Sequence, residues 1–141
     1  MKLTNNLYTY PEQGGLDCNT YIVKGRPGVI IDPGSADFLA ARLAGMKADG
    51  IDPAEIGVIV NTHLHIDHCG ANGAFKKLSG ARIALHPVHQ ANYQLVVIDG
   101  ARLFGIEPAE FTADYTLDEC LLKSGDLTME MIPSPGHSPD C

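Results

Sequence analysis

One short segment of the chain gathers three histidines and an aspartate: Thr62-His63-Leu64-His65-Ile66-Asp67-His68-Cys69-Gly70. The apolar run at residues 56–61 comes directly before it, which indicates that a strand ends where the segment begins. In an extended backbone the side chains at 63, 65 and 67 point to the same side, and a turn at Gly70 can bring His68 to join them. Imidazoles and a carboxylate that converge in this way have the donor types and spacing of a metal site.

Such a donor set predicts metal-assisted hydrolysis. A zinc-type ion held by neutral imidazoles lowers the pKa of a bound water from about 16 toward about 7 and polarises the carbonyl or phosphoryl oxygen under attack. Asp67 would orient the hydroxide and is the candidate catalytic residue, although an aspartate here could instead cap the following helix. The histidine and aspartate content of the chain makes a chance H-x-H-x-D-H about a one-in-a-thousand event, which indicates a specified motif.

The elements around this motif predict an α/β fold. Strands are expected at residues 6–10, 19–24, 29–32 and 56–61, and the continuously apolar ones should be buried on both faces. Ser35 can cap a helix that runs to residue 49, and Asp52-Pro53-Ala54-Glu55 has the pattern of a capping box. Strand, helix and strand in succession are typical of layered α/β proteins, whose chemistry sits at strand ends.

In the second half of the chain, helices and strands are predicted to continue in alternation. We expect a helix at 71–78 and a strand at 81–85, followed by a helical stretch at 87–111 with breaks at Gly100, Gly105 and Pro108. Alternation of Leu127, Met129 and Met131 with polar residues predicts a strand with one buried face.

Several residues outside the motif have ordinary structural interpretations. Tyr93 and Phe104 could line a substrate pocket, but packing of their helix is favoured. His86 and His89 are expected at the surface or at a helix start, and Asp32 is expected to bond backbone N–H groups in the turn after its strand. The four cysteines, which contain no C-x-x-C pair, are interpreted as reduced thiols: Cys18, Cys69, Cys120 and Cys141.

The composition of the chain limits the kinds of partner that it is expected to bind. The chain has 141 residues and a net charge of −7, so no overall positive field exists to hold nucleic acid. Its longest apolar runs fall far short of the roughly 20 residues needed to cross a membrane. The first ten residues lack the apolar core of a secretory signal. We therefore expect a cytoplasmic protein that acts on a small-molecule substrate, without nucleic-acid or membrane partners.

Taken together, the motifs resemble those of the metallo-β-lactamase superfamily. The H-x-H-x-D-H segment is similar to the signature of that family, and residues 19–23, 29–34 and 135–139 resemble its early strands, its D-x-G turn and its third metal motif. The resemblance implies that His63, His65 and His137 hold a first metal and that Asp67 and His68 begin a second site. It also implies one or two zinc ions, with iron or manganese as alternatives.

The resemblance covers the first part of the family fold, a four-layer αββα sandwich. It implies that residues 1–141 form the N-terminal half of one such domain, and that a C-terminal half supplies a bridging aspartate and a final histidine. Apolar strands need cover on both faces, so we expect a missing half, or a second copy of the chain in a homodimer, to cover the open sheet face.

Three functions compete at this stage. The leading one is a dinuclear metal-dependent hydrolase of a thioester or other ester, similar to hydroxyacylglutathione hydrolase (glyoxalase II). The second is a mononuclear iron persulfide dioxygenase, which in this superfamily uses a similar three-histidine set. The third is a partial domain that binds metal without turnover.

Overall fold

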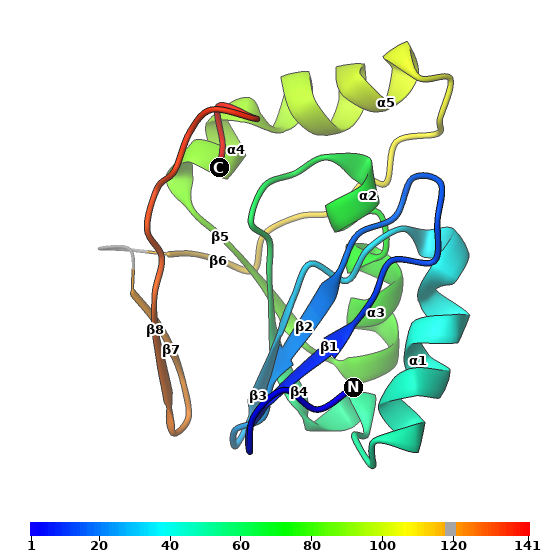
Figure 1. Ribbon diagram of the computed structural model, residues 1–141. Helices are drawn as coiled ribbons and strands as arrows, with labels where there is room; N and C mark the ends of the chain where they lie inside the picture. The colour runs from blue at the N-terminus through cyan, green and yellow to red at the C-terminus, as the bar shows by residue number, and fades with distance from the viewer. Residues whose placement is uncertain (118–120) are drawn as a thin grey trace.

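A six-stranded mixed sheet forms the centre of the computed structural model, which describes residues 1–117 and 121–141 (Figure 1). Its spatial order follows the chain: β1 (Leu7–Tyr10), β2 (Thr20–Val23), β3 (Gly28–Ile31), β4 (Ile56–Val60), β5 (Arg82–Leu85) and β6 (Tyr115–Thr116). The β1–β2 and β2–β3 pairs are antiparallel, and the pairs from β3 to β6 are parallel. The predicted α/β class and its strands are confirmed, whereas β6 had no sequence signal that we recognised.

Helices cover one face of this sheet. The 3-10 turn η1 (Ala36–Phe38) leads into α1 (Leu39–Ala48), the capped turn η2 (Pro53–Glu55) precedes β4, and α3 (Asn72–Ser79) follows the histidine motif. Their apolar side chains, including Met46 and Phe75, pack with strand residues such as Ile30, and all three are fully buried. The Ser35 cap and the Asp52 capping box form as predicted. This apolar layer fixes the sheet beneath the histidine motif.

A two-stranded hairpin covers the opposite face. It consists of β7 (Leu121–Ser124) and β8 (Leu127–Glu130), which pair antiparallel. Leu122 of β7, together with Leu127 and Met129 of β8, packs in one cluster with Val29 and Val58 of the main sheet. The predicted alternation along β8 is confirmed. Val29 and Val58 are at most 3% exposed, so the hairpin supplies cover on this face that the sequence did not lead us to expect.

Helices α4 (Pro87–Tyr93), η3 (Gln94–Asp99, a π-helix) and α5 (Gly100–Leu103) form one continuous helical arm after β5 (Figure 1). The predicted break at Gly100 is wrong, because the wider π-helical turns pass directly into α5 there. The arm ends before Gly105, whose φ of +69° suits glycine. No helix in the described ranges is long and apolar enough to cross a membrane.

The aromatic residues of this arm differ in their surroundings. Tyr93 packs edge-on against Phe111 with ring centroids 5.4 Å apart, and its hydroxyl accepts a hydrogen bond from the Phe111 N–H at 2.9 Å. The predicted packing role of Tyr93 is therefore confirmed. Phe104 is 70% exposed, so the packing role expected for it is wrong. It follows α5, where the chain turns away from the core.

Candidate metal centre

The histidine motif follows the end of β4 and leads into the short helix α2 (Ile66–Cys69), shown in green in Figure 1. Residues 61–65 are irregular, and His65 has an extended backbone with φ −63° and ψ 149°. Asp67 therefore lies in a helix, which corrects the expectation that an extended backbone carries residues 63, 65 and 67 in one row. The first turn of α2 brings in His68, rather than a turn at Gly70.

Three imidazoles converge above the strand end. Nε2 of His63 and Nδ1 of His65 are 3.1 Å apart, and the ring of His137 lies 5.0 Å and 4.9 Å from theirs, measured between centroids. The candidate ligand atoms of the three residues all lie within 4.8 Å of one another. His63 is buried, His65 is half-buried and His137 is exposed, so the cluster opens to solvent on one side. The structure thus places together the three histidines that the sequence assigned to a first metal.

This geometry fits a metal ion. Two imidazole nitrogens bound to one tetrahedral zinc at about 2.0–2.1 Å are separated by roughly 3.3 Å, close to the spacing of His63 and His65. Burial, and then the neighbouring His68 and His65 rings, lower the pKa of His63 to about 4. His63 is therefore neutral at physiological pH, which is the protonation state that binds metal.

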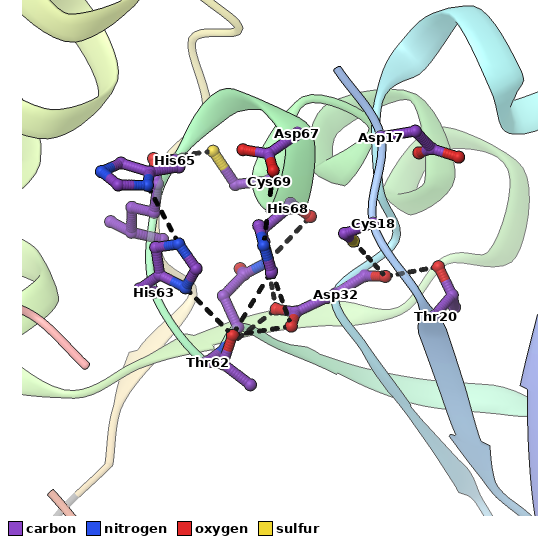
Figure 2. Close-up of polar contacts among 12 residues, drawn as sticks. Asp17, Cys18, Thr20, Asp32, Thr62, His63, His65, Asp67, His68 and Cys69 are labelled. Atoms are coloured by element: carbon purple, nitrogen blue, oxygen red, sulfur yellow. Dashed lines mark hydrogen bonds and ion pairs between the residues drawn. The ribbon is translucent and has the colours of Figure 1, made fainter. Parts of the chain in front are cut away.

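Asp67 and His68 face each other beside this cluster (Figure 2). Oδ2 of Asp67 lies 3.5 Å from Nε2 of His68, and the His68 ring centroid is 4.0 Å from that of His63. Both side chains are partly exposed, at 28% and 21%. Their facing atoms form an oxygen and nitrogen pair next to the three imidazoles.

Asp32 holds His68 from below. Its Oδ2 is 3.0 Å from Nδ1 of His68 and accepts a hydrogen bond from the Thr62 hydroxyl at 2.7 Å, while Oδ1 accepts from the Thr62 N–H at 2.8 Å (Figure 2). Burial alone would lower the pKa of His68, but the hydrogen bond and charge of Asp32, with the charge of Asp67, raise it. The predicted bonding of Asp32 to the backbone is confirmed for one N–H group, that of Thr62. Its link to His68 was missed, although a carboxylate at the end of a neighbouring parallel strand was the available signal.

A buried ion pair supports the turn that carries Asp32. Nη2 of Arg42 lies 3.0 Å from Oδ2 of Asp17, and Nη1 donates to the Pro33 carbonyl at 2.8 Å. Oδ1 of Asp17 accepts from the Ser35 N–H at 3.0 Å. Helix α1 and the loop before β2 are therefore fastened to the two sides of this turn, which fixes Asp32 relative to the motif.

The remaining candidates have structural roles. Cys69 is fully buried and donates from Sγ to the Leu64 carbonyl at 3.3 Å, and burial raises the pKa of its thiol. The side chain of His86 accepts the Val88 N–H at the start of α4, so its helix-start interpretation is confirmed. His89 is only 4% exposed, so a surface position is wrong for it, but it lies in the first turn of α4 and its side chain accepts the His86 N–H, so its helix-start interpretation is confirmed. Cys120 lies outside the described residues.

The comparisons with known proteins agree with this architecture. The model of the metallo-beta-lactamase superfamily matches residues 13–141, and the chain belongs to that superfamily. A subclass B3 metallo-beta-lactamase of Bradyrhizobium japonicum has the same fold, with a TM-score of 0.83 and 24% identity over 100% of this chain and 53% of that one.

Two curated relatives have narrower names. A hydroxyacylglutathione hydrolase of Anaeromyxobacter dehalogenans is 31% identical over 89% of this chain and 40% of its own length. An N-acyl homoserine lactonase of Rhizobium johnstonii is 34% identical over 66% of this chain and 36% of its own length. The chain thus spans well under half the length of these two relatives, and about half that of the lactamase.

Proposed function

We propose that this protein is a metal-dependent hydrolase that cleaves a thioester or another ester of a small molecule. The convergence of His63, His65 and His137 carries the proposal, because three imidazoles at this spacing form the ligand set of a catalytic ion that keeps a position open. The exposure of His137 leaves that position reachable from solvent. Asp67 and His68 are the proposed start of a second site, and zinc is the metal that these donors suit best.

The relatives support the substrate class. One is named a hydroxyacylglutathione hydrolase and another an N-acyl homoserine lactonase. A thioester and a lactone both present an acyl carbon to attack by water, so one arrangement of catalytic groups serves both reactions. We place the thioester first, because the hydroxyacylglutathione hydrolase aligns with more of this chain than the lactonase does.

A divalent ion bound at the three histidines would acidify water and polarise the substrate carbonyl. The chain supplies the positioning. Asp67 presents a partly exposed carboxylate that can accept a hydrogen bond from the attacking water and fix its direction. Asp32 orients the His68 ring through Nδ1, which leaves Nε2 turned toward Asp67. Neutral His63 avoids placing a positive charge where a metal ion would bind.

Substitution of the two kinds of residue tests the proposal. In the full-length protein, His63→Ala should lower the bound metal itself, whereas Asp67→Ala should keep the fold and the metal at the three histidines but lose most hydrolysis. Asp99→Ala is the control, since it removes an exposed helical aspartate that pairs with Arg102 and not with a residue of the motif. Metal content is measured by elemental analysis, and turnover by thiol release from a hydroxyacylglutathione thioester and ring opening of an acyl homoserine lactone.

Two results would contradict the proposal. A parent protein that binds no metal would remove its basis. An Asp67→Ala variant that hydrolyses the thioester as fast as the parent would show that the role given to Asp67 is wrong.

An iron-dependent persulfide dioxygenase is the second candidate. The three histidines form a ligand group among the described residues without a carboxylate, which suits a single iron ion as well as zinc. Bound iron together with oxygen consumption in the presence of glutathione persulfide would favour this reaction. Tight metal binding without turnover of any of these substrates would indicate a domain that only binds metal.

A further inference from the structure

A fully buried carboxylate lies three residues after His137. Asp140 has no exposed surface, and its Oδ2 accepts a hydrogen bond from the Leu64 N–H at 2.9 Å. Its other oxygen, Oδ1, accepts from the hydroxyl of Ser138, which is 2% exposed. The side chain thus connects two segments that are 76 residues apart in the sequence.

The position of Leu64 makes this contact informative. Leu64 lies between His63 and His65, so the acceptor for its N–H fixes the backbone from which both imidazoles project. Asp140 lies in the same turn as His137, which is closed by hydrogen bonds from the Gly136 and Cys141 N–H groups to the Ser138 carbonyl. One carboxylate therefore joins the backbone of two proposed ligands to the turn that presents the third.

Burial of a carboxylate is costly unless its charge is compensated. Asp17 is compensated by Arg42, but Asp140 forms no ion pair with a lysine or arginine in the part of the chain that the structure describes. A buried carboxylate that accepts from a backbone N–H and a hydroxyl, without a lysine or arginine partner, adds little to stability. Its place between the ligand segments gives it another role.

A second buried side chain closes the same junction. His89 comes from α4, and its Nδ1 accepts the His86 N–H at 3.4 Å. The His89 ring lies against the backbones of Asp140 and Thr62. The junction therefore receives support from α4 as well as from Asp140, on the side away from solvent.

We infer that Asp140 is a positioning residue, which locks the backbone between His63 and His65 to the turn of His137 so that the three imidazoles are preset for one metal ion. The inference rests on the proposed metal site but goes beyond it, since Asp140 is not one of the three proposed ligands. Residues that orient the ligands of a metal site commonly change its affinity by about 10-fold to 100-fold when they are replaced.

The test compares Asp140→Ala with Asp140→Asn in the full-length protein. An asparagine can still accept from the Leu64 N–H through its oxygen, and its amide can donate to the Ser138 hydroxyl, so it preserves the link without the charge. We expect Asp140→Ala to weaken zinc binding by about 10-fold to 100-fold, and Asp140→Asn to restore most of the affinity. Affinity is measured by competition with a chromophoric chelator, and ligand geometry by the visible absorption of the cobalt-substituted protein.

Asp114→Ala is the matched control. Asp114 also accepts a backbone hydrogen bond, from the Ile83 N–H at 2.8 Å, but beside β5 and β6. It should lower stability in urea without changing zinc affinity or the cobalt spectrum. If Asp140→Ala does not fold, Ser138→Ala replaces it, with a smaller loss of affinity expected because Oδ1 alone loses its donor.

The outcomes separate this inference from the proposed function. Unchanged zinc affinity and an unchanged cobalt spectrum in Asp140→Ala, or in Ser138→Ala where it stands in, would overturn the positioning role while leaving the metal site intact. The same holds if Asp140→Asn binds zinc as weakly as Asp140→Ala. Absence of metal binding in the parent protein would overturn both.

Discussion

Replacement of Asp17 by asparagine should destabilise the protein severely. The carboxylate of Asp17 and the guanidinium of Arg42 are 0% and 1% exposed, so the pair is removed from water almost completely. In Asp17→Asn the guanidinium keeps its charge but loses the oppositely charged partner in a site that water does not reach. Removal of one partner of such a pair typically costs about 3–5 kcal/mol.

The hydrogen bonds of Asp17 and Arg42 indicate where in that range the loss of folding stability should fall. Nη2 of Arg42 contacts both Asp17 oxygens at 3.0 Å, and one of those oxygens also accepts the Ser35 N–H. The carbonyls of Pro33 and Cys18 remain as acceptors for Arg42 in the variant. We therefore expect about 3 kcal/mol, the lower end of the range, against a total stability of about 5–15 kcal/mol.

Urea unfolding followed by circular dichroism measures the difference. Lys76→Met is the control, because Lys76 and Asp114 form a pair whose side chains are 36% and 28% exposed, and such pairs contribute about 0–1 kcal/mol. A loss in Asp17→Asn that does not exceed the loss in Lys76→Met would refute the reasoning. A midpoint shift with an unchanged slope would confirm that the variant loses stability without a change of the unfolded state.

Further predictions concern pH, a hairpin turn and the second metal site. Burial would raise the pKa of Asp17, but the Ser35 and Gln13 N–H groups and Arg42 outweigh it and hold the pKa below 3.8, so stability should fall more steeply below pH 4 in the parent than in Asp17→Asn. Gly125→Ala should lower the free energy of unfolding by about 2 kcal/mol or more, because φ is +56° and the new Cβ would overlap the Arg26 carbonyl. Gly105→Ala is the control, since its φ is also positive, at +69°, but its new Cβ would meet open space, so the loss should be smaller. Thermal unfolding measures both. Asp32→Ala should weaken a second metal ion by about 10-fold to 100-fold in a titration and spare the three-histidine ion; equal loss of both ions would contradict this.

Much of the fold could be predicted because its signals are local. The continuously apolar strands β3 and β4, the Asp52 capping box and the left-handed Gly80 after α3 each depend on a few neighbouring residues. The histidine motif belongs to the same class, because four of its side chains are concentrated beside one strand end. His137 was assigned by resemblance to a family, and the structure brings its ring to the others.

What the sequence did not reveal depends on contacts between distant segments. The hairpin of β7 and β8 covers Val29 and Val58. This contact could be predicted only if the way the hairpin folds back onto the sheet were known. The backbone of Asp67 was assigned to the wrong conformation, since two-residue spacing in H-x-H-x-D suits a strand although helix α2 already begins at Ile66. The burial of Asp140 against Leu64 has no local signal at all, because an aspartate after a proline in a loop is ordinarily exposed.

The sheet order has a consequence for how the molecule is made. Its six strands are neighbours in space in the order in which they are synthesised, so each new strand meets an edge that is already present. Asp32, at the end of β3, is translated before the motif that it supports, and Thr62 and His68 reach it as soon as β4 has paired. His137 follows the β7–β8 hairpin, so it is synthesised after the strand end that carries the other histidines. During synthesis on the ribosome, the strand end that carries the first two histidines can therefore form early, and their backbone is locked only when the turn of His137 and Asp140 follows.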